Sequence, residues 1–106
     1  MKLDEIAILD PKQKEKTQTQ KPKMYICILH NDPFTHAHRV VDLLKKYFNH
    51  GEQAAMTIMV QAHRLDKAPC GGPYTKDVAE SKAKNAMDEA KKEEFPLLIT
   101  IDEVGA

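Results

Sequence analysis

The spacing of the hydrophobic residues changes along this chain, and each change predicts a different element. Tyr25–Leu29 is a short run rich in β-formers and predicts a strand. After residue 35, apolar side chains recur every three or four positions, as on one face of a helix. They are Ala37, Val40, Val41, Leu44, Tyr47 and Phe48. Thr35 is a suitable N-cap for this helix, and Gly51 can end it in the left-handed conformation.

A second amphipathic helix is predicted to end near His63. Its apolar residues are Ala54, Ala55, Ile58, Met59 and Ala62. The segment Pro69–Pro73 is rich in Gly and Pro and predicts a turn-rich break that flanks a short strand.

Thr75 can cap a third helix, in which Asp77 and Lys91-Lys92 have the signs that suit the helix dipole. Its apolar stripe is Val78, Ala79, Ala83, Ala86, Met87 and Ala90. Phe95-Pro96 ends this helix because Pro cannot continue it. Leu97–Ile101 is then a closing strand.

The predicted order is β-α-α-(β)-α-β, with helices too close together in sequence for a doubly wound sheet. We therefore expect an α+β domain, in which a small antiparallel sheet of about three strands is packed against three helices.

Residues 1–23 differ in composition from residues 24–106, which form the predicted core domain. Pro11–Lys23 has no apolar residue outside its prolines, so we expect a flexible, disordered N-terminal tail. The tail begins with a small apolar patch made of Leu3, Ile6, Ile8 and Leu9. This patch is either an unstructured leader or a short peptide that binds a partner.

Length and charge exclude several classes of protein. A chain of 106 residues is one small domain. Its net charge of zero provides no bulk attraction to nucleic acid or anionic membranes. No apolar run approaches the ~20 residues of a transmembrane helix. Cys27 and Cys70 do not suggest a disulfide framework, so we expect a reducing, cytoplasmic location.

The histidines and cysteines do not predict an enzyme, a metal or a cofactor. His36 and His38 are two positions apart, about 200° around a helix, and cannot chelate one ion from it. His30, His50 and His63 lack metal-motif spacing. Nothing local marks Cys70 and His63 as a thiolate dyad. Surface or structural roles are expected for these side chains.

Asn31 and Asp32 come directly after the first predicted strand and just before a helix. A carboxylate beside the apolar face of that helix suits a ligand with a positive head and an apolar side chain. The free N-terminal residue of a polypeptide is such a ligand. His63 is either a helix cap at the edge of the core or a polar rim for a pocket shared with Asn31 and Asp32.

The ordered set of motifs from Tyr25 to Val104 resembles the ClpS family of bacterial N-degron adaptors. Its members deliver substrates to the ClpA unfoldase of the ClpAP protease. The resemblance rests on Ile28–Asp32 with Thr35, Val40-Val41, Leu44–Phe48, Ala62-His63, Cys70-Gly71, Tyr74-Thr75, Val78–Lys82, Pro96–Leu98 and Thr100–Glu103. The family also has a flexible N-terminal extension.

The resemblance implies roles for individual residues. Asn31, Asp32 and His63 correspond to the ligands of the substrate's α-amino group. The wall of the pocket for the first side chain corresponds to Thr35, Ala37, Val40, Leu43, Met59, Ala62 and Leu97. Asp77, Glu80 and Lys82 correspond to contacts with the N-terminal domain of a ClpA-type unfoldase, although sequence alone favours a solvated helix face. We expect a protein that is monomeric on its own and needs no cofactor.

Four positions depart from the family pattern. Pro33 replaces a second Asp, Ala37 replaces a bulky Met, and Ala62 replaces Val. The run from Cys70 to Thr75 is one residue longer than usual. The two alanines predict a wider pocket that could admit Trp, Ile or Val. The alternative is a protein-interaction module that kept the fold and lost N-degron binding.

Overall fold

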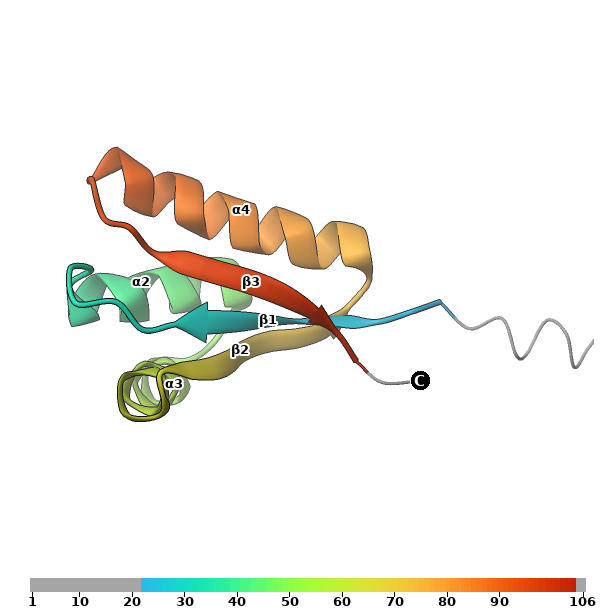
Figure 1. The fold of residues 1–106 in the computed structure, drawn as a ribbon, viewed down its shortest axis with the longest axis horizontal. Helices are drawn as coiled ribbons and strands as arrows, with labels where there is room; N and C mark the ends of the chain where they lie inside the picture. Colours follow the sequence, from blue (N-terminus) through green and yellow to red (C-terminus); the bar gives the residue numbers. More distant parts are fainter. Residues whose placement is uncertain (1–21, 105–106) are drawn as a thin grey trace, which may run out of the picture.

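A computed structural model describes residues 22–104 of the chain (Figure 1). The predicted tail, residues 1–23, lies outside the described residues except for its last two, so the division of the chain at residue 24 stays a prediction. The described elements are β1 (Tyr25–His30), α2 (Ala37–Phe48), α3 (Glu52–Leu65), β2 (Lys67–Tyr74), α4 (Lys76–Lys92) and β3 (Leu98–Glu103).

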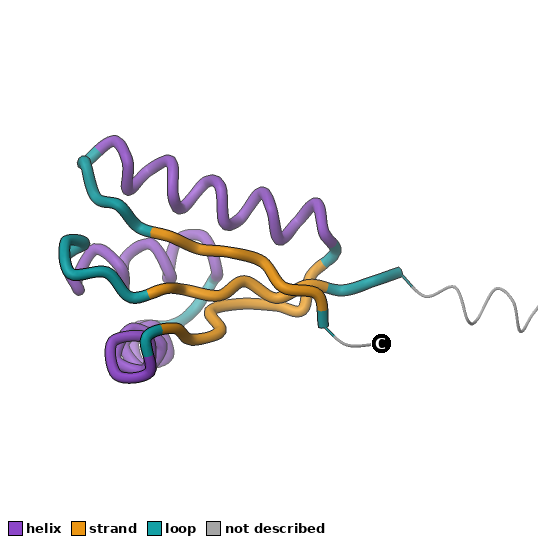
Figure 2. Tube along the Cα trace, in the orientation of Figure 1, coloured by secondary structure: helices purple, strands orange, loops and turns teal. Residues whose placement is uncertain are grey.

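The three strands form one antiparallel sheet in the order β2-β1-β3. In Figures 1 and 2 the helices lie above, behind and below the strands, and none crosses in front of them. Alternate residues of β1 enter the core, where Cys27 and Leu29 are at most 2% exposed. The predicted α+β class, with three antiparallel strands and three helices, is confirmed.

The helices contribute unequal side chains to the core. The buried positions of α2 are large and include Leu43, Leu44 and Phe48. The buried positions of α4 are all alanines: Ala79, Ala83, Ala86 and Ala90. Ala54 and Val78 are exposed, contrary to the prediction that places them on apolar helix faces. The core is therefore filled mainly from α2 and the sheet, and α4 lies close against them through small side chains.

Both predicted ends of α2 were wrong. The helix begins at Ala37 with His36 in the N-cap position, while Thr35 belongs to the turn before it. Asn49, not Gly51, takes the left-handed conformation after the helix, with φ of 59°. Asn tolerates this conformation better than most residues, and Gly51 instead occupies the N-cap of α3 with φ of −75°.

The predicted break at Pro69–Pro73 is also wrong, because this segment is the middle of β2. Pro is tolerated there because β2 is an edge strand. The pairing with β1 has register shifts around Cys27. Gly72 has φ of +122°, and a Cβ atom on it would lie 2.9 Å from the carbonyl oxygen of Tyr25. The glycine therefore permits close strand pairing instead of a turn.

The third helix and the last strand were predicted more accurately. Thr75 does occupy the N-cap of α4, although its side chain makes no capping hydrogen bond. The helix ends at Lys92, just before Phe95-Pro96. β3 begins at Leu98, which leaves Leu97 in the connection before it.

We predict that Leu44→Ala destabilises the protein by ~2–5 kcal/mol, because it removes a side chain that is 1% exposed and leaves a cavity. Urea unfolding followed by circular dichroism measures the change. Leu65→Ala is the control, since Leu65 is 65% exposed, and it should change the unfolding free energy by less than ~0.5 kcal/mol. Equal losses for both variants would contradict this description of the core.

Candidate functional site

A cavity of about 80 Å³ lies where β1 ends, with walls from α2, α3 and the connection before β3. It is lined by Leu29, His30, Asn31, Asp32, Thr35, Ala37, Val40, Met59, Ala62, His63 and Leu97. The three predicted polar residues and six of the seven predicted wall residues are thus brought together from four separate segments. The structure places them around one cavity, and their role in ligand binding stays a prediction.

Leu43, the seventh predicted wall residue, does not line the cavity. Its side chain is 2% exposed and belongs to the hydrophobic core. Two lining residues, Leu29 and His30, were missed by the sequence analysis. Both are the last residues of β1, and their strand position next to Asn31 was the signal that could have identified them.

The carboxylate of Asp32 is held by the turn that it starts. Its Oδ1 accepts hydrogen bonds from the backbone N–H groups of Phe34 at 2.8 Å and Thr35 at 2.7 Å. Its Oδ2 accepts the Thr35 hydroxyl at 2.9 Å. A carboxylate has about four acceptor sites, so three donors fix its position and leave capacity for a ligand cation. Thr35 therefore orients Asp32 instead of capping α2.

Asn31 is tied to the end of α3. Its backbone N–H donates to the carbonyl oxygen of Asp66 at 2.9 Å, and Asp66 ends α3 with φ of 75°. His63 lies in the last turn of the same helix and is exposed. This one backbone hydrogen bond therefore joins the loop that carries Asn31 and Asp32 to the helix that carries His63.

The inner wall of the cavity is apolar and contains two short side chains. Leu29, Val40 and Leu97 are between 2% and 8% exposed, and Met59 is half-buried. Ala62 is 2% exposed, whereas Ala37 is exposed at the start of α2. The arrangement combines polar acceptors with an apolar wall, which suits a cation that carries an apolar side chain.

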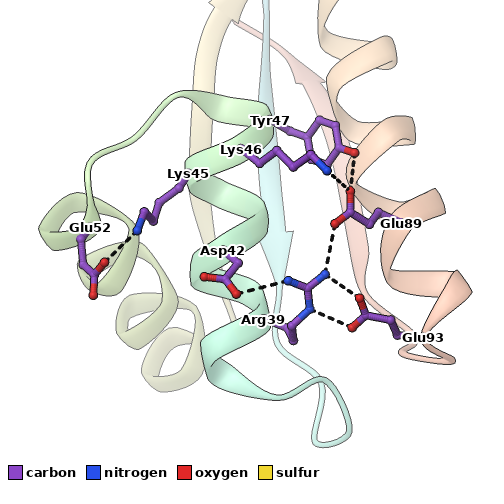
Figure 3. Close-up of polar contacts among 8 residues, drawn as sticks. All are labelled: Arg39, Asp42, Lys45, Lys46, Tyr47, Glu52, Glu89 and Glu93. Atoms are coloured by element: carbon purple, nitrogen blue, oxygen red, sulfur yellow. Dashed lines mark hydrogen bonds and ion pairs between the residues drawn. The ribbon is translucent and has the colours of Figure 1, made fainter.

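A group of charged side chains joins α2 to α4 close to this wall (Figure 3). Arg39, which precedes Val40, binds Glu89 of α4, Glu93 directly after that helix, and Asp42 of its own helix. Lys46 and Tyr47 also donate hydrogen bonds to Glu89. The hydrogen bonds from Lys46, Tyr47 and Arg39 lower the pKa of Glu89 to about 2.

The cysteines lie in the core, away from the cavity lining. Cys27 and Cys70 are both at most 1% exposed, and burial raises the pKa of each thiol. Buried thiols with raised pKa values are poor nucleophiles. His63 and Cys70 are not hydrogen-bonded to each other, and the carbonyl oxygen of Cys70 lies 2.6 Å from Nε2 of His50.

Residues 22–104 contain neither a metal-binding cluster nor a membrane-spanning helix. No group of three or more His, Cys, Asp or Glu side chains in this range could hold a metal ion. None of its helices combines the length and the hydrophobicity needed to span a bilayer.

The three predicted unfoldase contacts lie on the first half of α4 and do not line the cavity. Asp77 and Glu80 are exposed. Lys82 is half-buried, and its ammonium group donates to the carbonyl oxygen of Tyr47 at 3.0 Å and lies 5.3 Å from the ring centre of Tyr74. Lys82 therefore already has a structural role within the domain.

Comparisons with known proteins agree with the fold and the motifs. The family described as "ATP-dependent Clp protease adaptor protein ClpS" matches residues 20–100. ClpS 2 of Mesorhizobium japonicum is 45% identical over 87% of this chain and 90% of its own length. ClpS 1 of Bradyrhizobium diazoefficiens is 38% identical over 91% of this chain and 94% of its own.

A solved structure of a ClpS protein also matches this chain. Agrobacterium tumefaciens ClpS2 bound to L-phenylalaninamide matches with a TM-score of 0.76 and 36% identity. The match covers 79% of this chain and all of that one. The ligand in that structure has a free α-amino group and an aromatic side chain, which are the two features that a polar rim and an apolar wall can bind.

Proposed function

The chain belongs to the ClpS family of Clp protease adaptors, and we propose that it recognises the N-terminal residue of proteins that carry an N-degron. In this proposal Asn31, Asp32 and His63 bind the free α-amino group, and the apolar wall holds a large first side chain. The cavity carries the proposal, since it places these three polar residues beside the wall. The ligand of the Agrobacterium tumefaciens relative supports it.

Selectivity for a chain end follows from the charge of the α-amino group. This group has a pKa of about 7.7–8.0 and is mostly ionised at neutral pH. It can donate to the Asp32 carboxylate, the Asn31 side-chain oxygen and a neutral nitrogen of His63. Internal residues of a protein offer no such cation. Acetylation would remove the charge and two of the donors.

The magnitudes suit an adaptor that must release its cargo. Burial of a Leu or Phe side chain contributes ~1.5–3 kcal/mol. Each hydrogen bond to a charged group contributes ~1.5–3 kcal/mol before the cost of ordering both partners is subtracted. Two or three such bonds with the apolar contribution approach the ~8 kcal/mol of a micromolar complex.

We further propose that the cargo is delivered to the N-terminal domain of a ClpA-type unfoldase. The exposed carboxylates of Asp77 and Glu80 offer one docking surface on α4. Lys82 can join them, because its ammonium group has three donors and only one is used by Tyr47. The proposed role of residues 1–23 is to engage the unfoldase during delivery.

The first prediction from the proposed function concerns the charged N-terminus of the ligand peptide. A labelled peptide that begins with Phe should bind in fluorescence anisotropy, and its N-acetylated form should not. Asp32→Asn keeps the size of the side chain but removes its charge, so we expect a loss of about tenfold to a hundredfold in affinity. Asp102→Ala is the control, since Asp102 is exposed on β3 and absent from the cavity lining.

Binding of free and acetylated peptides with equal affinity would contradict recognition of the α-amino group. Unchanged affinity in the Asp32→Asn variant would place the amino group elsewhere. Failure of both peptides to bind would favour an interaction module that kept the fold, once Trp, Ile and Val peptides had also failed.

The second prediction concerns the width of the pocket. Because Ala37 and Ala62 shorten the wall, we expect measurable binding of peptides that begin with Trp, Ile or Val. Ala37→Met and Ala62→Val restore the larger side chains and should weaken binding of these peptides relative to Leu. Val60→Ala, on an exposed part of α3 that does not line the cavity, is the control. A wild-type protein that rejects Ile and Val would refute the wide pocket.

The third prediction separates binding from delivery. Deletion of residues 1–22 leaves β1 and all cavity-lining residues in place. The truncated protein should therefore bind the Phe peptide with unchanged affinity. Degradation of an N-degron substrate by the ClpA-type unfoldase and its protease should be slower. Full degradation by the truncated protein would show that the tail has no part in delivery.

A further inference from the structure

The contact between α2 and α4 has little interlocking of large side chains. α4 contributes four buried alanines to the core, and Met87 is its larger, half-buried residue that packs against it. Alanine offers few atoms for close contact, so a surface made of it resists sliding less than a surface with large interdigitating side chains. Polar contacts between the two helices can therefore contribute to where the C-terminal half of α4 lies relative to α2.

Arg39 provides the most extensive of these contacts, beside the hydrogen bonds from Lys46 and Tyr47 to Glu89 (Figure 3). Its Nε donates to Oε1 of Glu93 at 2.7 Å and its Nη2 donates to Oε2 at 2.6 Å, which is a two-point contact with one carboxylate. Nη2 also donates to Glu89 at 3.1 Å, and Nη1 donates to Asp42 at 3.2 Å. The planar guanidinium therefore fixes both distance and direction between the helices.

The residues at the two ends of this contact are close in sequence to residues that line two different walls of the cavity. Val40, the residue after Arg39, lines the cavity from α2. Ala37, two residues before Arg39, also lines it. Leu97, four residues after Glu93, lines it from the connection to β3. The ring centroids of His36 and Phe95 are 5.0 Å apart, and these rings make a second contact between the same two segments.

We propose that Arg39 is a positioning residue that sets the spacing between the α2 wall and Leu97, and thereby the size of the first side chain that the pocket accepts. This inference rests on the proposed function. Arg39 does not itself line the cavity, so it acts through Val40 and Leu97. Loss of the contact would let the two walls separate, which favours large first side chains over small ones.

Partial burial of Arg39 and Glu89 distinguishes this network from an ordinary surface ion pair, since their side chains are 20% and 22% exposed. Glu93, the partner in the two-point contact, is 41% exposed. The contact also combines a two-point geometry with a network, which are the conditions under which ion pairs have measurable effects. The pair between Lys45 of α2 and Glu52 of α3 is more exposed, at 40% and 66%, and has a single contact at 2.8 Å. It supplies a matched control.

The test compares Arg39→Gln, Glu93→Gln, the double variant and the control Lys45→Gln. Affinities are measured for free-amino peptides that begin with Leu, Phe, Trp and Ile, and for acetylated Phe. In Arg39→Gln and Glu93→Gln we expect the preference for Trp over Leu to rise about threefold to tenfold. The double variant should behave like Arg39→Gln, because that substitution already removes the contact with Glu93 together with those to Glu89 and Asp42. Lys45→Gln should keep the wild-type preference within about twofold.

A second measurement does not need a ligand. The N–H groups of Arg39 and Val40 donate to the carbonyl oxygen of His36 in the first turn of α2. Their hydrogen exchange in the free protein should be faster in Arg39→Gln than in Lys45→Gln. A general loss of stability would instead accelerate exchange throughout the core, including the N–H of Ile99.

The outcomes separate the two proposals. Equal effects of Arg39→Gln and Lys45→Gln on the Trp-to-Leu preference would overturn the positioning role. Binding of the free Phe peptide to the wild type would then leave the proposed function standing. A uniform loss of affinity for all peptides would overturn the positioning role as well, because it would indicate general destabilisation. Failure of the wild type to bind any free-amino peptide would refute the proposed function and the role of Arg39 in selectivity, and exchange would then decide the positioning alone.

Discussion

The position of β1 between β2 and β3 is the constraint on which the rest of the site depends. β1 is the central strand and is hydrogen-bonded on both sides, so its end at His30 is held more firmly than a strand at the edge. Asn31 and Asp32 follow directly, so the end of the strand determines where they lie. The backbone hydrogen bond from Asn31 to Asp66 then holds the end of α3 beside the end of β1. A ligand cation would therefore meet acceptors that need little reorganisation, which lowers the entropic cost of binding.

Hydrophobic periodicity predicted the helices well. The predictions failed at residues whose type fits more than one local conformation. Gly51 and Asn49 can both take the left-handed conformation, and the pattern alone could not show that Gly51 would be needed to begin α3. Pro69–Pro73 has the composition of a turn. Its strand conformation depends on an edge position and on the close approach of Gly72 to Tyr25, and both are tertiary features.

The candidate site was predicted largely through resemblance to a family, and its geometry shows what sequence could not supply. The apolar spacing of α2 does not distinguish Leu43 in the core from Val40 at the cavity, since both are buried. The contact of Arg39 with Glu93 joins residues 54 positions apart. A charged residue in an amphipathic helix looks like part of a solvated face until the partner helix is in place.

Small side chains occur both in the wall of the cavity and in the buried face of α4, and the two facts have a common physical consequence. Ala37 and Ala62 contribute few atoms to the lining of the cavity. The buried residues of α4 are alanines, which let the helix lie close but offer few atoms that interlock with its neighbours. In the positioning role that we propose, directional contacts outside the cavity lining supplement this packing, since the Arg39 guanidinium binds one carboxylate at two points. That role would make polar contacts beside the cavity supplement the packing inside it, so substitutions outside the cavity would change which first side chains it accepts.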